Sequence, residues 1–196
     1  MLVLDTSRYP VSDRAEVLHS GLAALAGVDL APMEGDDLIK LRFRAWDLGD
    51  GCSLLHARST GFRFSRRPDG GCGAESPVIG FSLMPAGSAR FSQGDRQEVI
   101  PGGGMFIAEM DQTFDCGFAK GSEGVNLQIP LAVLDIPLRE VRTAARWLPL
   151  SPVAALASQH LTALVRYTTE FDAPHPAAQQ AALHVLRALI KSFGTD

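Results

Sequence analysis

The sequence predicts a mainly β protein with added helices. A barrel or sandwich of short strands is preceded by one helix and followed by an antiparallel helix pair. Residues 38–130 contain short apolar or alternating segments separated by glycine and proline, which is typical of all-β barrels and sandwiches. Apolar residues recur at helical spacing before and after that region. With 46% hydrophobic residues among 196, the chain can bury a sizeable core without disulfides or metals.

Residues 1–37 are expected to form an N-terminal arm and a helix. The helix is predicted over 11–27, where Asp13 can cap the first turn and Glu16 follows three positions later. Gly27 stands where such a helix would stop. We expect this segment to belong to one integrated domain with the rest of the chain.

The first predicted strand of the barrel is LIKLRFRAW. In it Leu41, Phe43 and Ala45 point to one side, whereas Arg42 and Arg44 point to the other. The same reasoning predicts short strands in GFRFSRR, in VIGFSLM, on both sides of a turn at 93–96 in ARFSQGDRQEVI, and in MFIAEM, FDCGF and GVNLQI.

Residues 131–196 are predicted to return to helix and to form the C-terminal pair. Ser151 is a typical helix N-cap, and Pro152 suits the first helical position. The two helices are predicted over 152–171 and 177–193, with the chain broken between them at DAPHP.

Three consecutive glycines, Gly102–Gly103–Gly104, raise the question of a phosphate-binding loop. Such a loop needs backbone N–H groups at a helix N-terminus, and usually a lysine. Here the glycines lead into Met105–Phe106–Ile107–Ala108, which is apolar and strand-like, and no Lys-Ser or Lys-Thr follows. Because glycine tolerates positive φ, PGGG is interpreted as a tight connection between two barrel strands.

The formal net charge is −4, but the charge is unevenly distributed. From Lys40 to Arg67 the chain carries seven basic and two acidic residues. This run is either a solvated basic face or a docking patch for an anion, DNA or another domain. The acidic overall balance argues against a free-standing nucleic-acid binder.

Cysteine usage and hydropathy indicate a cytoplasmic protein. Cys52, Cys72 and Cys116 show no C-x-x-C spacing, and the first residues do not resemble a signal peptide. We therefore expect free thiols in a reducing compartment. No apolar run approaches the ~20 residues of a membrane span, so no membrane contact is expected.

A family resemblance emerges in GFSLMPAGSARFSQGDRQEVIPGGGMFIAEMDQTFDCGF, residues 80–118. The order of apolar strands, glycine-containing turns and a Pro-Gly turn resembles the double-stranded β-helix core of the sensing domain in AraC/XylS-type transcription regulators. VNLQIPLAVLDIP, residues 125–137, resembles the segment that closes that barrel. The resemblance covers roughly residues 38–193, including the helix pair. It departs from the family pattern at Gly103, where an acid is usual, and at Leu131, where an arginine is usual.

The resemblance implies a cupin-like jelly-roll barrel for a small-molecule effector and a C-terminal helix pair that forms a homodimer. The chain is then the effector-binding and dimerisation domain of an AraC-like transcription regulator. We expect it to be a fragment that meets DNA only through a missing helix-turn-helix domain. One alternative is a stand-alone cupin-type small-molecule-binding protein or enzyme. Another is a structural dimerisation module whose barrel is packed solid.

Aromatic residues on the apolar strand faces are the candidates for an effector pocket, and they indicate a mainly apolar or aromatic ligand. Trp46 either marks the mouth of this pocket or covers the outside of the sheet. The candidate pocket residues are Phe43, Trp46, Phe62, Phe64, Phe81, Phe91, Phe106 and Phe118. The candidate dimer-interface residues are Leu156, His160, Leu164, Leu183, Leu186 and Ile190.

No catalytic residue, metal or cofactor is predicted. A cupin-type metal centre needs about three convergent ligands. The five histidines form no H-x-H pair, and FSLMPAGSARFSQ, where such a motif belongs, contains no histidine. His160 is interpreted as a packed histidine or a pocket or interface contact, and Cys116 as a small buried hydrophobe.

Overall fold

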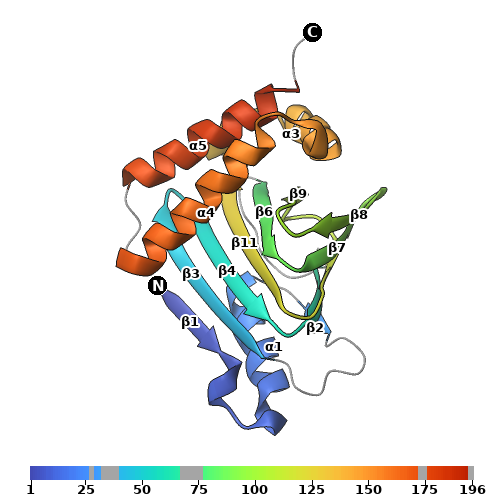
Figure 1. The fold of residues 1–196 in the computed structure, drawn as a ribbon, viewed down its shortest axis with the longest axis vertical. Helices are drawn as coiled ribbons and strands as arrows, with labels where there is room; N and C mark the ends of the chain where they lie inside the picture. The colour runs from blue at the N-terminus through green and yellow to red at the C-terminus, as the bar shows by residue number, and fades with distance from the viewer. Residues whose placement is uncertain (27–28, 32–39, 67–76, 172–175, 194–196) are drawn as a thin grey trace.

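The computed structural model describes residues 1–26, 29–31, 40–66, 77–171 and 176–193, which form two facing antiparallel sheets and a group of helices (Figure 1). The six-stranded sheet has the order β1 (Leu2–Asp5), β3 (Leu41–Gly49), β4 (Cys52–Ser59), β11 (Ser122–Pro130), β6 (Val78–Ala86) and β9 (Met105–Glu109). The five-stranded sheet has the order β2 (Asp29–Ala31), β5 (Phe62–Arg66), β10 (Phe114–Phe118), β7 (Ser88–Gln93) and β8 (Arg96–Pro101). The expected jelly-roll barrel is confirmed.

The helices are α1 (Arg14–Ala26), α2 (Leu131–Leu134), α3 (Leu138–Trp147), α4 (Ala154–Phe171) and α5 (Pro176–Lys191), with short 3-10 turns at Thr6–Arg8, Val11–Asp13 and Leu148–Leu150. Helices α2 to α5 gather on one side of this sandwich, and α1 lies at the other end, beside β2 (Figure 1). The predicted C-terminal pair is confirmed as α4 and α5, which lie side by side across the six-stranded sheet (Figure 1). The predicted break at 172–175 lies outside the described residues. No single helix in the described part of the chain is long and apolar enough to cross a membrane.

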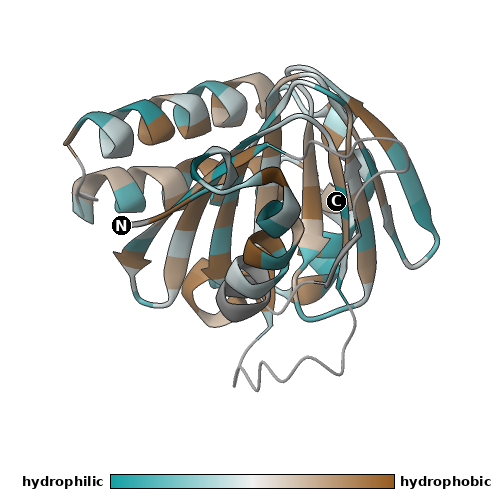
Figure 2. Ribbon diagram, turned by 90° about the horizontal axis from the view of Figure 1, so that it is seen from below, coloured by the Kyte–Doolittle hydropathy of each residue, from teal (hydrophilic) through white to brown (hydrophobic). Residues whose placement is uncertain are grey.

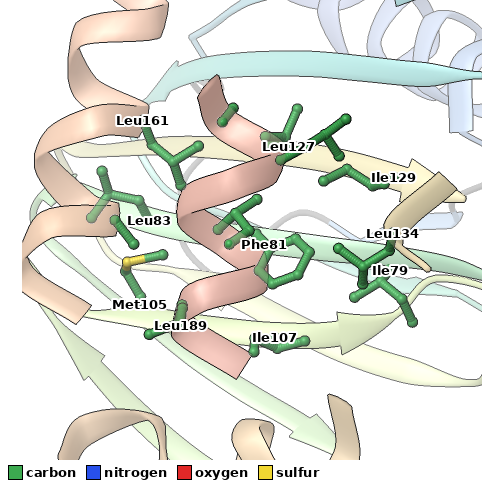
Figure 3. Close-up of a cluster of buried hydrophobic side chains, with 14 of the residues drawn as sticks. Ile79, Phe81, Leu83, Met105, Ile107, Leu127, Ile129, Leu134, Leu161 and Leu189 are labelled. Carbon is green, nitrogen blue, oxygen red and sulfur yellow. The ribbon is translucent and has the colours of Figure 1, made fainter. Parts of the chain in front are cut away.

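Side-chain alternation gives the six-stranded sheet two apolar faces, and Figure 2 shows hydrophobic and hydrophilic segments alternating along the strands. One face packs against the five-stranded sheet, and the other lies under α4 and α5. On β6, Phe81 and Leu83 belong to the helix-side core, whereas Met84 belongs to the core between the sheets. Figure 3 shows Leu161 of α4 and Leu189 of α5 reaching into the helix-side core.

Two arginines tie the helices to the rest of the fold. On α5, the Arg187 guanidinium donates to the main-chain carbonyls of Leu134 at 3.0 Å and Val133 at 2.9 Å. On α3, Arg142 makes a two-pronged ion pair with Glu109 of β9, with both N–O distances at 2.8 Å. These contacts join the helices to the closing segment after β11 and to an edge strand of the sheet.

The glycine run forms the predicted turn between β8 and β9. Gly103 has φ of +82°, a left-handed conformation that favours glycine. Its N–H donates to the Met84 carbonyl at 2.6 Å, and the Gly104 N–H donates to the Pro101 carbonyl at 2.9 Å. The run therefore serves a strand connection, as expected.

The sequence analysis did not predict five strands and helices: β1, β2, β4, α2 and α3. β1 has only four residues, too few to show alternation, and it forms by pairing with β3. The sequence of α3 does carry a helical signal, since Val141, Ala144 and Ala145 fall on one buried face after Pro137. Residues 131–196 therefore hold more than the predicted pair.

Candidate functional site

A cavity of about 100 Å³ lies between the two sheets. The residues around it are Phe43, Leu55, Ala57, Phe62, Phe64, Ser82, Leu83, Met84, Phe106, Ala108, Met110, Phe114, Cys116, Phe118, Gly124, Val125, Asn126 and Gln128. Dry apolar cavities of about 150 Å³ in proteins bind molecules such as benzene. The space is therefore of the order needed for a small apolar ligand.

Stacked aromatic rings from β5 and β10 form one wall of the cavity. Phe62 and Phe118 are directly paired across the two strands, and their ring centroids lie 4.9 Å apart. Phe64 stacks on Phe118, with ring centroids 5.9 Å apart, and meets Phe114 edge to face, with centroids 5.7 Å apart. Aromatic pairs at these separations are favourable beyond the area they bury. The rings hold one another in place and present a firm apolar surface.

Small side chains on the opposite wall explain why space remains. Ala57 on β4, Ala108 on β9 and Gly124 on β11 line the cavity from the six-stranded sheet. A Cβ atom on Gly124 would lie 3.0 Å from Phe118, so even alanine would crowd the aromatic wall. Larger side chains at these positions would fill the void.

The cavity wall carries few polar side chains: Ser82, Asn126 and Gln128. The Asn126 Nδ2 group donates to the Ser82 hydroxyl at 2.8 Å. Its Oδ1 atom is buried and has no hydrogen-bond partner among the described residues. A buried acceptor without a partner is costly, and it would match an O–H or N–H group brought by a ligand.

The structure brings most of the predicted pocket residues together. Phe43, Phe62, Phe64, Phe106 and Phe118 line the cavity. Phe114, Met84 and the small residues of the opposite wall were not predicted, although the same alternation that selected Phe118 also places Phe114 inward.

Three predicted pocket residues lie elsewhere. Phe91 belongs to the core between the sheets but packs behind Phe106, with ring centroids 4.5 Å apart. Trp46 and Phe81 point to the other face of the six-stranded sheet and are buried under the helices. Their assignment to the pocket was wrong. β6 is buried on both faces, so composition does not separate them, whereas on β3 Trp46 alternates onto the same face as Arg44.

The predicted dimer-interface residues are also divided. Leu164, Leu183, Leu186 and Ile190 are at most 4% exposed and pack within the helix-side core. Their assignment to an intermolecular surface is corrected, because their apolar stripe faces the chain's own sheet. Leu156 is 55% exposed. His160 is half-buried, and its Nε2 atom has no hydrogen-bond partner in the described part of the chain.

The described cysteines are buried and free. Cys116 lies against the cavity, and burial raises the pKa of its thiol far above the ordinary value. Cys52 lies in the helix-side core, and burial raises its pKa as well. Cys72 lies outside the described residues. No group of three or more His, Cys, Asp or Glu side chains within the described ranges is arranged to hold a metal ion.

A family model and a crystal structure agree with this architecture. A family model described as AraC-binding-like domain matches residues 23–193. The crystal structure of the AraC-like transcriptional activator CuxR is similar over 100% of this chain and 70% of its own, with 12% sequence identity and a TM-score of 0.76. The cupin domain of an XRE family transcriptional regulator from Enterobacter cloacae matches 45% of this chain and 94% of its own, with 8% identity and a TM-score of 0.37. A search of curated proteins found no match.

Proposed function

Because the chain belongs to the AraC-binding-like domain family, a family of regulatory domains, we propose that it senses a small-molecule effector for a transcription regulator. The effector binds in the cavity between the two sheets. The observation that carries this proposal is the cavity itself, which is walled by six phenylalanines and stays open opposite small side chains. These apolar walls suit binding rather than catalysis. In this role the domain works in the cytoplasm, and DNA is contacted by a separate DNA-binding domain.

The wall chemistry favours a small aromatic or aliphatic ligand. An aromatic ring stacks on Phe62 and Phe118, whose own separation is 4.9 Å. Burying a ring of side-chain size, about 150–250 Å², contributes on the order of 4–6 kcal/mol at about 25 cal/mol per Å². Association entropy then offsets part of that gain. One hydroxyl or amine group on the ligand donates to the free Oδ1 of Asn126.

The sheet that lines the cavity also supports the helix pair, and this gives a route for a signal. On β6, Met84 faces the cavity while its neighbour Leu83 packs under α4 and α5. A ligand that binds one arrangement of this strand and the helices more tightly than another shifts the equilibrium between them. The size of the shift is the difference in binding free energy.

A homodimer formed through the outer faces of α4 and α5 is the second part of the proposal. Leu156 is 55% exposed there, and the cores of homodimer interfaces are more apolar than the rest of the surface. Sedimentation velocity tests this: Leu156→Asp weakens the dimer and leaves the monomer folded. Leu186→Asp places a charge in the core and unfolds the chain. A monomeric wild-type protein, or a Leu156→Asp variant that dimerises equally well, contradicts the dimer.

A thermal-shift screen of small aromatic and aliphatic compounds tests the sensing role. For any compound that raises the melting temperature, hydrogen exchange is measured with and without it. The proposal predicts changed protection in the cavity strands and in both α4 and α5. A compound that protects the cavity strands and leaves both helices unchanged contradicts the sensing role.

A further inference from the structure

A second hollow lies outside the barrel, between the six-stranded sheet and α4, which crosses that face of the sheet (Figure 1). Its volume is about 380 Å³, within the small-molecule range of roughly 300–1,000 Å³. We call it the arginine groove. Its lining residues are Arg42, Arg44, His56, Arg58, Pro85, Glu123, Val125, Thr162, Val165, Arg166, Thr169 and Glu170.

Strand alternation separates the arginine groove from the apolar cavity. On β3, Phe43 faces the cavity, while Arg42 and Arg44 face the groove. On β4, Ala57 faces the cavity, while Arg58 faces the groove. The two hollows therefore lie on opposite faces of one sheet and are different sites.

The groove gathers like charges at a cost to the fold. In the register of β3 and β4, Arg42 lies opposite Arg58, and Arg44 lies opposite His56. Arg42 and Arg58 are therefore like charges directly opposite one another, which destabilise an antiparallel pair. The neutral His56 leaves the Arg44 charge without a partner across the strands. Four arginines and two glutamates line the groove, so two positive charges are in excess while His56 is neutral. A bound anion would relieve this repulsion.

The Glu123 carboxylate is already engaged on one side of the groove. It lies 2.8 Å from His56 Nε2 and 3.1 Å from Arg58 Nε. Burial favours a raised pKa for Glu123, but the hydrogen bonds from Arg58 and His56 outweigh it and hold the pKa below the ordinary value. Burial lowers the pKa of His56 despite its acidic partner, so the ring donates its Nε2 hydrogen as a neutral group. Glu123, His56 and Arg58 thus satisfy one another's hydrogen-bonding groups, and the Glu123 charge neutralises that of Arg58.

The other three arginines of the groove, Arg42, Arg44 and Arg166, are not neutralised by an ion pair within the described residues. Asp5 lies opposite Arg42 on β1, but its carboxylate accepts from the hydroxyl and backbone of Ser7, which lower its pKa, and Arg42 adds only a weaker attraction. Arg44 is half-buried, where an uncompensated charge is expensive. Arg166 approaches from α4, so cations face the groove from both the sheet and the helix.

We propose that the arginine groove binds a small organic phosphate. A guanidinium offers a planar fork of donors that matches phosphate oxygens two at a time. Arg44 from the sheet and Arg166 from α4 hold the phosphate between them, and Arg42 neutralises it from the same strand. The bound phosphate fastens α4 to β3, so it acts on the same helix that the cavity ligand is proposed to move.

Isothermal titration of the whole chain with pyrophosphate tests this assignment. Arg44→Gln and Arg166→Gln each remove one of the two facing forks, and both are expected to weaken binding about 10- to 100-fold, the worth of a charged hydrogen bond. Arg166 is exposed on a helix, so Arg166→Gln keeps the fold intact. It therefore tests the site even if Arg44→Gln destabilises the protein. Arg90→Gln is the matched control, because Arg90 is an exposed arginine on β7 of the other sheet, and it leaves the affinity unchanged.

Three results would overturn the phosphate site. The first is that pyrophosphate does not bind. The second is equal weakening in Arg166→Gln and Arg90→Gln, which would indicate diffuse attraction to surface charge. The third is equally tight binding of succinate, which would assign the groove to carboxylates. Because both hollows are on one chain but share no wall residue except Val125, failure here leaves the effector cavity untouched.

Discussion

Replacing Ala108 with leucine measures how much room the cavity holds. Ala108 lies on β9, is 2% exposed and lines the cavity. Leucine adds three carbon atoms, and at about 0.8 kcal/mol for each buried carbon the gain is about 2.4 kcal/mol. Fixing the leucine rotamer costs about 0.5–1 kcal/mol. The free energy of unfolding should therefore rise by about 1.5–2 kcal/mol, and the melting temperature by about 3–8 °C for a domain of this size.

Urea denaturation of wild type, Ala108→Leu and Ala89→Leu gives the comparison. Ala89 is 1% exposed and lies on β7 in the same core, but it does not line the cavity. Leucine there overpacks the core, and the free energy of unfolding falls by about 1–3 kcal/mol. If Ala108→Leu destabilises the protein as much as Ala89→Leu does, the space between the sheets is already filled and the reasoning fails.

Three further predictions concern the turns, the groove and the buried thiol. Gly87→Ala lowers the urea midpoint more than Gly103→Ala does. Both positions have positive φ, which costs about 1–2 kcal/mol for alanine, but only at Gly87 would the added Cβ overlap a neighbouring side chain. Equal losses of stability in the two variants would disprove this. Burial lowers the folded-state pKa of His56, so the free energy of unfolding falls as the pH drops below the ordinary value of 6.5 toward that lowered pKa. His56→Gln removes this part of the pH dependence, and an unchanged pH dependence in the variant argues against a neutral ring beside Glu123. Cys116, buried and with a raised pKa, should resist a thiol reagent until the chain unfolds, and peptide mass spectrometry that finds it labelled in the native state would contradict its burial.

The sequence was sufficient to predict the β region, its turns and the inward direction of many side chains. On β5, Phe62 and Phe64 alternate with Arg63, so only one inward face is possible. The turn at Gly103 was equally clear, because three glycines between apolar strands leave little else.

The remaining assignments needed the tertiary structure. Strand β6 is buried on both faces, so nothing local shows that Phe81 lies under the helices rather than in the cavity. A helical stripe such as Leu183 and Leu186 shows that a face is buried, but not whether a sheet or a second chain buries it. The arginine groove depends on strand register, since Arg58 and Arg166 lie on elements far apart in sequence. Only the local basic run, interpreted as a solvated face or an anion-docking patch, pointed toward it.

The most direct test of the effector cavity is the melting temperature of the protein at increasing benzene concentration. A ligand that binds only the folded state raises the stability with the logarithm of its concentration once it exceeds Kd. We predict such a rise for wild type, and none for Ala108→Leu, whose side chain occupies the same space. The absence of a rise in wild type, or an equal rise in both proteins, would contradict a ligand cavity between the sheets.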